Sequence, residues 1–241
     1  MPYEFPSATP HGEIQEIFQD VFHLTGSVEM VPGMQISRAM TILRRSGKLT
    51  LISPIRLSDA GLRQLEALGE VTNIVQLGGY HLGARNGLDD PFYVDRYGAT
   101  LWALPGMEHK GGLRPDRILR KGGDMPQLGL SLHVYESSKL PEGLLLLERE
   151  GGILIAADSL QNWTQPDAFF SPIAADRMGA AGFFTPANIG PEWLRFCTPE
   201  VADFDQIRAL PFRHLLPSHG TPLLDSAKEA LIKRIDTLFV T

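Results

Sequence analysis

Three residues that end or follow predicted strands carry the chemistry that this sequence offers. His81 lies in a glycine-rich turn directly after a buried-looking strand, Asp158 ends a second apolar strand, and His219 follows a third. Loops at strand ends are where a rigid sheet presents functional groups. Two imidazoles and one carboxylate are a ligand set for zinc, iron(II) or a similar ion. The residue types therefore predict a divalent-metal site, provided that the fold brings them together.

Each of the three residues also has a purely structural interpretation. A single histidine in a turn is commonly a hydrogen-bonded structural residue, and Asp158 followed by Ser159 is a pair that caps turns. His219 followed by Gly220 is equally typical of a turn. Taken one at a time, the three residues leave both interpretations open.

Other catalytic motifs are absent from the sequence. It contains no glycine-rich dinucleotide fingerprint, no P-loop, no nucleophile elbow around a serine, no CxxC pair and no HExxH zinc motif. Cys197 has no neighbouring histidine in the sequence, so we expect a small, semi-buried side chain rather than a catalytic thiolate. Among the other histidines, His133 is the best substitute ligand, whereas His214 lies among apolar residues and is expected in the core.

Composition excludes several classes of protein. The chain has 241 residues, 43% of them hydrophobic and 21% charged, which is typical of a soluble globular domain. A net charge of −6 gives no basic surface for nucleic acid or an anionic membrane. One cysteine, no apolar stretch of membrane-spanning length and no signal-peptide pattern predict a cytoplasmic protein. We expect one domain over residues 1–241.

The expected elements are short and are separated by glycine and proline. A hairpin is predicted over 39–53 with Gly47 in its turn, and a helix is predicted to begin after Ser58 and to end at Gly69. Strand pairs, strand–helix alternation and a closing helix favour stacked sheets with helices outside. The remaining predicted elements are strands at 73–77, 100–103, 143–147, 153–157 and 213–216, and helices at 90–98 and 225–239.

The order of these fragments resembles the metallo-β-lactamase superfamily, and most closely an uncharacterised branch of it. The run Val75–Gly83 fits the family's Thr-His-x-His-x-Asp-His-x-Gly motif without a gap, Ile153–Ser159 fits the strand with the bridging aspartate, and Leu216–Gly220 fits the final histidine loop. The resemblance covers about residues 20–235. It implies an α/β fold, a four-layer αββα sandwich of two mixed sheets flanked by helices.

The sequence departs from the family motif at every ligand of the first metal position. The first two motif histidines fall on Gln76 and Gly78, and the motif aspartate falls on Tyr80. The family's proline-glycine-histidine turn falls on the segment 139–143, which puts Lys139 at the position of a histidine ligand. The resemblance therefore implies that the first metal position is lost.

The second metal position keeps its histidine, bridging aspartate and last histidine as His81, Asp158 and His219. These imply a mononuclear hydrolase that binds one divalent metal (zinc, iron or manganese) and activates water against a small-molecule substrate. In this interpretation Asp158 belongs to the catalytic site, Lys139 stabilises an oxyanion or neutralises that carboxylate, and Tyr80 hydrogen-bonds a bound water. The alternative for Lys139 is a solvated side chain at the surface.

The alternative is a catalytically inactive scaffold that acts as a ligand-binding or interaction protein. We expect the segments 105–130 and 166–191 to wall the site, with the phenylalanines of the second lining a pocket, covering the sheet or forming a subunit contact. Homo-oligomerisation and the identity of the substrate stay open at this stage.

Overall fold

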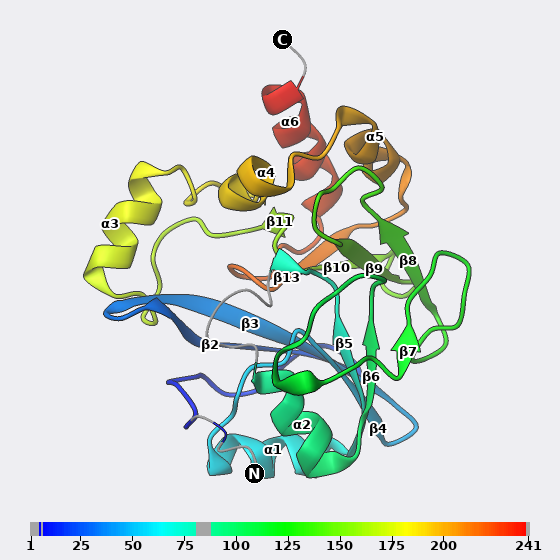
Figure 1. Cartoon of the computed structure of the whole chain (residues 1–241). Coiled ribbons are helices and arrows are strands. Elements are labelled where there is room, and N and C mark those ends of the chain that lie inside the picture. Colours follow the sequence, from blue (N-terminus) through cyan, green and yellow to red (C-terminus); the bar gives the residue numbers. More distant parts are fainter. Residues whose placement is uncertain (1–4, 6, 81–87, 240–241) are drawn as a thin grey trace.

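The structure is a computed structural model that describes residue 5, residues 7–80 and residues 88–239. Figure 1 shows its layers: a pair of helices, a large sheet, a smaller sheet and a further group of helices. Both sheets contain parallel and antiparallel pairs. The predicted αββα sandwich of two mixed sheets is confirmed.

Among the described residues, the larger sheet has seven strands that lie side by side in sequence order. Strands up to β4 pair antiparallel, and the later ones pair parallel. The long hairpin of the second and third strands projects beyond the rest of the sheet (Figure 1). The strands are β1 (Gln15–Phe18), β2 (Val21–Val31), β3 (Met34–Arg45), β4 (Lys48–Ile52), β5 (Glu70–Gln76), β6 (Thr100–Ala103) and β7 (Arg117–Ile118).

The smaller sheet has the order β13-β10-β9-β8 in the described part of the chain. Its strands β10 and β13 are parallel, so the chain leaves both at the same edge of the sheet. A separate short pair, β11 (Leu160–Gln161) and β12 (Asn188–Ile189), follows. The strands of the smaller sheet are β8 (Leu130–Val134), β9 (Gly143–Leu147), β10 (Ile153–Ala156) and β13 (His214–Pro217).

Helices cover the outer faces of both sheets. The larger sheet packs against α1 (Asp59–Leu68) and α2 (Asp89–Tyr97), and the smaller one against α4, α5 and α6. Helix α3 lies apart from both groups, against the projecting end of the β2–β3 hairpin (Figure 1). The remaining helices are α3 (Pro172–Ala180), α4 (Pro191–Cys197), α5 (Val201–Ala209) and α6 (Ala227–Phe239), with a short 3-10 turn at Lys110–Gly112.

Burial of both faces of each sheet explains the apolar runs in the sequence. The run Leu144–Leu147 is buried throughout, because β9 has the other sheet on one face and helices on the other. The layer between the sheets contains Leu43, Val75, Leu145, Ile155 and Leu216. None of the helices in the described residues is long and apolar enough to cross a membrane.

Several local predictions are confirmed. The hairpin predicted over 39–53 is the end of β3 with β4, and Ser46 and Gly47 in its turn have positive φ, as a type I′ turn requires. Helix α1 begins after Ser58, whose Oγ accepts a hydrogen bond from the backbone N–H of Gly61. The strand and helix predicted between residues 70 and 98 correspond to β5 and α2.

Other elements were not predicted, namely β1, β2, β7, β8, β11, β12 and the helices α3 to α5. Strand β2 alternates apolar residues with His23, Thr25 and Ser27, which is a strand signal that the sequence analysis missed. Its β-structure comes from pairing with β3 over ten residue pairs. The segment 105–130, predicted as a long surface loop, contains the 3-10 turn and β7.

Candidate active site

Asp158 and His219 meet because they follow neighbouring parallel strands. In the β10–β13 pair, Ala156 lies opposite Pro217. Asp158 follows Ala156 by two positions, and His219 follows Pro217 by two positions. The Nε2 atom of His219 lies 3.0 Å from Oδ1 of Asp158, and each side chain is only 8% exposed. Residues 61 positions apart in the sequence are thus joined at the edge where both strands end, as predicted for these two.

The loop of His219 is fixed by its neighbour. Gly220 has a φ of +100°, and a Cβ atom there would collide with the backbone of Asn162. The backbone N–H of Asn162 donates to the His219 carbonyl at 2.9 Å. The ring of Trp163 lies with its centroid 4.9 Å from that of His219. The imidazole is therefore held between a rigid turn and an aromatic wall.

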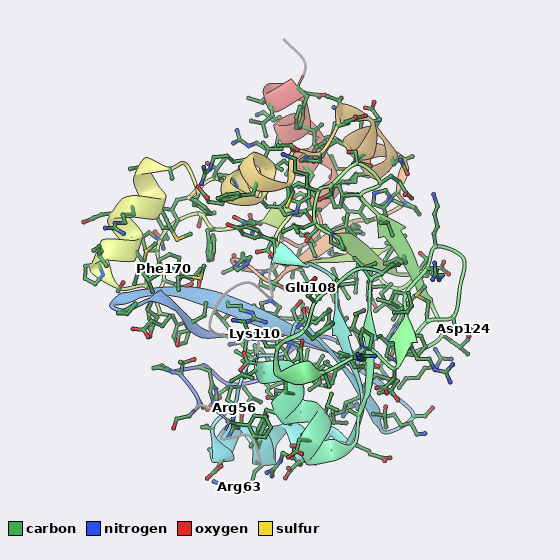
Figure 2. All side chains as sticks on the ribbon, viewed as in Figure 1. Arg56, Arg63, Glu108, Lys110, Asp124 and Phe170 are labelled. Carbon is green, nitrogen blue, oxygen red and sulfur yellow. The ribbon has the colours of Figure 1, made fainter. Side chains whose placement is uncertain are left out.

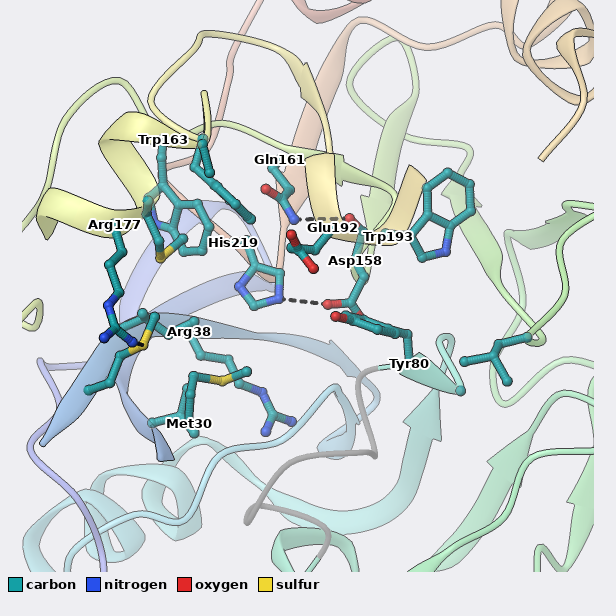
Figure 3. A pocket seen from close by; sticks show the side chains of 18 residues that line it. Met30, Arg38, Tyr80, Asp158, Gln161, Trp163, Arg177, Glu192, Trp193 and His219 are labelled. Atoms are coloured by element: carbon teal, nitrogen blue, oxygen red, sulfur yellow. Dashed lines mark hydrogen bonds and ion pairs between the residues drawn. The ribbon is translucent and has the colours of Figure 1, made fainter. Parts of the chain in front are cut away.

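His81, the third predicted ligand, lies outside the described residues. Its neighbour Tyr80 is described, and it reaches toward Asp158 in the pocket (Figure 3). Burial, together with the negative charges of Glu192 and Asp158, raises the pKa of Tyr80 to about 12. The Tyr80 hydroxyl is therefore protonated at neutral pH, so it can donate a hydrogen bond and does not act as an anionic ligand.

Gln76 and Gly78, which stand at two motif-histidine positions of the resemblance, face other residues in this structure. The Nε2 atom of Gln76 donates to Oδ1 of Asp90 at 2.8 Å, so its amide faces another acid. A Cβ atom on Gly78 would collide with Oε2 of Glu142 and would lie 3.0 Å from the Ala157 side chain. No room is left beside Gly78 for a histidine side chain.

Glu142 is the site residue that sequence reasoning missed. Its side chain is fully buried, and its Oε1 accepts hydrogen bonds from the backbone N–H groups of Asp158 and Ser159, at 3.0 and 2.8 Å. Burial, reinforced by the charge of Asp158, raises the pKa of the Glu142 carboxyl well above its usual range. This favours the uncharged acid. The available signal was an acidic residue placed between a proline and the apolar strand β9.

Lys139 does not occupy the position expected for it. Its side chain is exposed and is not part of the pocket lining, while its backbone N–H donates to the Cys197 carbonyl. The turn instead directs Glu142 inward, three residues later. The group that this turn buries beside Gly78 is thus the carboxyl of Glu142 rather than an ammonium group.

A cluster of buried polar and charged side chains lies beneath the site. Nη1 of Arg38 is 3.7 Å from Oδ2 of Asp89, and its Nη2 donates to the Pro54 carbonyl at 3.2 Å. Nδ1 of His109 lies 3.5 Å from Oδ2 of Asp90. Burial, partly offset by Arg38, raises the pKa of Asp89 to about 7. Burial also lowers the pKa of Arg38, against the opposing influence of the nearby aspartates.

A cavity of about 610 Å³ opens over Asp158 and His219. Figure 3 shows both side chains at its inner surface, with Arg38 and Tyr80 beside them. Its wall is mostly apolar. The lining residues are Val28, Met30, Met34, Ile36, Arg38, Gly79, Tyr80, Leu140, Asp158, Gln161, Trp163, Arg177, Met178, Ala181, Phe183, Glu192, Trp193 and His219.

The two segments expected to wall the site behave differently. The segment 166–191 supplies Arg177, Met178, Ala181 and Phe183 to the pocket, whereas the segment 105–130 supplies none of its lining residues. Phe170, marked in Figure 2 near α3, does not line the pocket and instead packs edge-on against Trp163. The expectation for 105–130 was wrong, because the β2–β3 hairpin and α3 form that wall instead.

The remaining candidates lie elsewhere. His133 is on β8, among Lys121 and Gln206, and does not reach the pocket. His214 is buried, with its Nε2 near the Glu150 carbonyl at 2.9 Å, which confirms a core position. Cys197 is buried, and burial raises the pKa of its thiol, as expected for an inert cysteine.

Asp158 and His219 are suited to share one cation. Ligand atoms about 2.0–2.2 Å from one ion lie about 3.0–3.5 Å apart, so the 3.0 Å hydrogen-bonded separation of these two side chains is close to the one that a shared ion requires. Within the described ranges, which omit 81–87, no group of three or more His, Cys, Asp or Glu side chains is arranged to hold a metal ion. Asp158 and His219 are thus the two predicted ligands that lie in the described part of the chain.

The sequence matches no protein-family model and no curated protein. Solved structures do match. The metallo-β-lactamase FIM-1 from Pseudomonas aeruginosa, in its mono-zinc form, superposes with a TM-score of 0.62 at 13% identity, over 98% of this chain and 99% of that one. A metallo-β-lactamase from Hirschia baltica gives 0.59 at 15% identity, over 94% and 98% of the two chains.

A variant of the flavo di-iron protein from Thermotoga maritima is also similar, with a TM-score of 0.62 at 14% identity. The match covers 95% of this chain but 62% of the larger relative. The likeness extends over nearly the whole chain in proteins that share few residues with it. The chain therefore has the fold of the metallo-β-lactamase superfamily.

Proposed function

We propose that the protein is a metal-dependent hydrolase with a single-cation site formed by His81, Asp158 and His219. The observation that carries the proposal is the convergence of Asp158 and His219, from separate strands, at the inner end of a cavity. A buried imidazole and a buried carboxylate that meet at a cavity are a ligand pair for a divalent cation such as zinc, iron or manganese.

The site is mononuclear because the first metal position is filled by protein atoms. Glu142 lies against Gly78, and Gln76 is hydrogen-bonded to Asp90. The bound cation supplies a Lewis acid that polarises a carbonyl oxygen and makes water a better nucleophile at neutral pH. Proton transfer, hydrogen bonding to the substrate and the exclusion of water are carried out by side chains of the protein.

Asp158 is the described base closest to where that chemistry takes place. Its backbone is held by hydrogen bonds to Glu142, and its carboxylate accepts the proton that the attacking water loses. Tyr80 stays protonated and donates a hydrogen bond to a substrate oxygen. Trp163 covers the His219 ring and excludes water from that side. Lys139 has no part in this scheme.

Metal stoichiometry tests the proposal. Purified protein is stripped with a chelator, dialysed against zinc, manganese or iron(II), and analysed for metal per chain. We expect one ion per chain in the wild type and at least tenfold weaker binding in His219→Gln and Asp158→Asn. His133→Gln is the matched control, because it removes another buried histidine that lies away from the pocket.

His81→Gln then tests the third ligand by the same measurement. A wild-type chain that binds none of the three ions would overturn the metal site. Equal binding by wild type and His219→Gln would do the same.

The second candidate is a catalytically inactive scaffold that binds an apolar ligand. It is favoured by the absence, within the described residues, of a complete three-ligand group, and by the mostly apolar pocket. Hydrolysis by the metal-loaded protein that is lost in His219→Gln favours the enzyme. Ligand binding with no hydrolysis under any metal favours the scaffold.

A further inference from the structure

The pocket wall is built to hold an extended apolar group. On β3, Met34, Ile36 and Arg38 alternate with residues of the opposite face, so all three point into the cavity. Four residues of extended strand span about 13 Å. The cavity therefore runs along β3 from the buried guanidinium to the end of the hairpin, a length that suits a medium-length alkyl chain.

The opposite wall is apolar as well. Helix α3 and the residues after it bring Met178 and Phe183 over the hairpin, and Trp163 lies between them and His219. Methionine side chains adapt to flexible ligands because they are unbranched and polarizable. At the mouth, Nη1 of Arg177 lies 3.9 Å from Sδ of Met34. The polar groups are thus confined to the inner end and the rim.

The charges at the inner end disfavour an anionic reacting group. Asp89, Asp90 and Asp158 surround one cation, Arg38, which already pairs with Asp89. A divalent cation would bring this group of charges only to about neutrality. A phosphate dianion would therefore find no excess positive charge there. An uncharged carbonyl compound meets no such barrier.

We propose that the pocket takes an uncharged carboxylic ester whose acyl chain is apolar. The chain lies along Met34 and Ile36, and the ester carbonyl lies beside Asp158 and His219. The cleavage of the ester bond rests on the proposed function, whereas the binding of the apolar chain does not. The oxygen of a water molecule bonds to the carbonyl carbon, and the bond from that carbon to the alkoxide oxygen breaks. The proton that the water loses ends on the alcohol, and the acyl part leaves as the carboxylic acid.

Binding is measured first, with probes that cannot be hydrolysed. The 4-nitrophenyl ethers of methyl, butyl, hexyl and octyl chains resemble the esters, and their nitrophenyl group quenches tryptophan fluorescence. Trp163 and Trp193 both line the pocket, so quenching reports occupancy without metal or catalysis. Each methylene buried should raise affinity roughly fourfold until the pocket is full. We expect the octyl ether to bind at least tenfold more tightly than the methyl ether.

Two neighbouring residues of β2 provide a matched pair of variants. Met30 lines the pocket and Val31 does not, although both are partly exposed, at 37% and 49%. Met30→Asp places a short charge in the apolar wall, and we expect it to weaken octyl-ether binding at least fivefold. Val31→Asp carries the same charge on the same strand and should stay within twofold of the wild type.

The result that overturns the proposal is affinity that does not depend on chain length. Equal effects of Met30→Asp and Val31→Asp on octyl-ether binding would also overturn it. The metal-loaded protein is then assayed with 4-nitrophenyl acetate, butyrate and octanoate and with 4-nitrophenyl phosphate, and we expect kcat/KM to rise with acyl length and the phosphate to be inert. A reactive phosphate with unreactive esters overturns the substrate class.

The two proposals fail in different ways. Chain-length-dependent ether binding with no hydrolysis under any metal removes the proposed function and leaves an apolar-ligand pocket. Metal-dependent hydrolysis of the acetate, with ethers that do not bind, keeps the hydrolase and removes the apolar acyl chain.

Discussion

Glu142 offers the sharpest test of how the site is held together. Its Oε1 accepts from two buried backbone N–H groups, those of Asp158 and Ser159. Glu142→Ala leaves both donors without an acceptor, and each buried unsatisfied group costs about 1–3 kcal/mol. We therefore expect Glu142→Ala to lower the free energy of unfolding by about 2–6 kcal/mol. This is a large part of the stability of a typical domain.

Glu142→Gln separates this explanation from a simple loss of volume. The glutamine amide oxygen accepts the same two hydrogen bonds, and its NH₂ group takes the place of the second carboxyl oxygen. We expect a change in unfolding free energy of about 1 kcal/mol or less. Glu148→Ala, at the exposed end of the same segment, is the control and should stay within about 0.5 kcal/mol.

The measurement is urea unfolding followed by tryptophan fluorescence at pH 7, with each variant checked for an unchanged m-value. Equal destabilisation by alanine and glutamine would refute the role of the two backbone hydrogen bonds. So would an alanine variant as stable as the Glu148→Ala control. In either case, some other contact would hold the loop of Asp158.

Two further predictions concern the surroundings of the site. Burial lowers the pKa of His23, whose Nε2 lies 3.3 Å from the Pro217 carbonyl, to about 4. The folded state therefore excludes a proton that the unfolded chain binds below about pH 6.5, and stability should fall by up to about 3 kcal/mol as the pH drops from 6.5 to 4. His23→Gln should flatten the pH profile of the urea midpoint, and identical profiles would contradict the assignment. Gly220→Ala adds a collision with Asn162 to an unfavourable φ, and should cost more than about 1 kcal/mol. Gly182→Ala has a similar positive φ with open space around it, so equal costs in urea unfolding would exclude the collision.

The elements predicted correctly are those with local sequence signals, such as helix caps, apolar runs and terminal glycines. Helix α1 has a serine cap, a leucine stripe and a terminal glycine, and β10 is an uninterrupted apolar run. Strand β2 also carries a local signal, an alternation of apolar and polar residues, which the sequence analysis missed. Its antiparallel pairing with β3 over ten residue pairs, by contrast, depends on both strands and is visible only in the structure.

The candidate site divides in the same way. The types and order of Asp158 and His219 pointed to a shared site, because both follow apolar strands. That these strands are parallel neighbours, and so deliver both side chains to one edge, is a property of the sheet. Lys139 lies at the surface, one of the two places that the sequence left open for it, and the same turn buries Glu142 three residues later.

The sequence by itself determined the residue types that could bind a cation, the departures from the family motif at Gln76, Gly78 and Tyr80, and the alternation of strands and helices. Only the tertiary structure decided that Glu142 is buried beside Gly78 and that a hairpin and a distant helix enclose an apolar cavity. The physical reason is that a motif constrains neighbours along the chain, whereas burial, collisions and charge pairing depend on residues brought together from far apart.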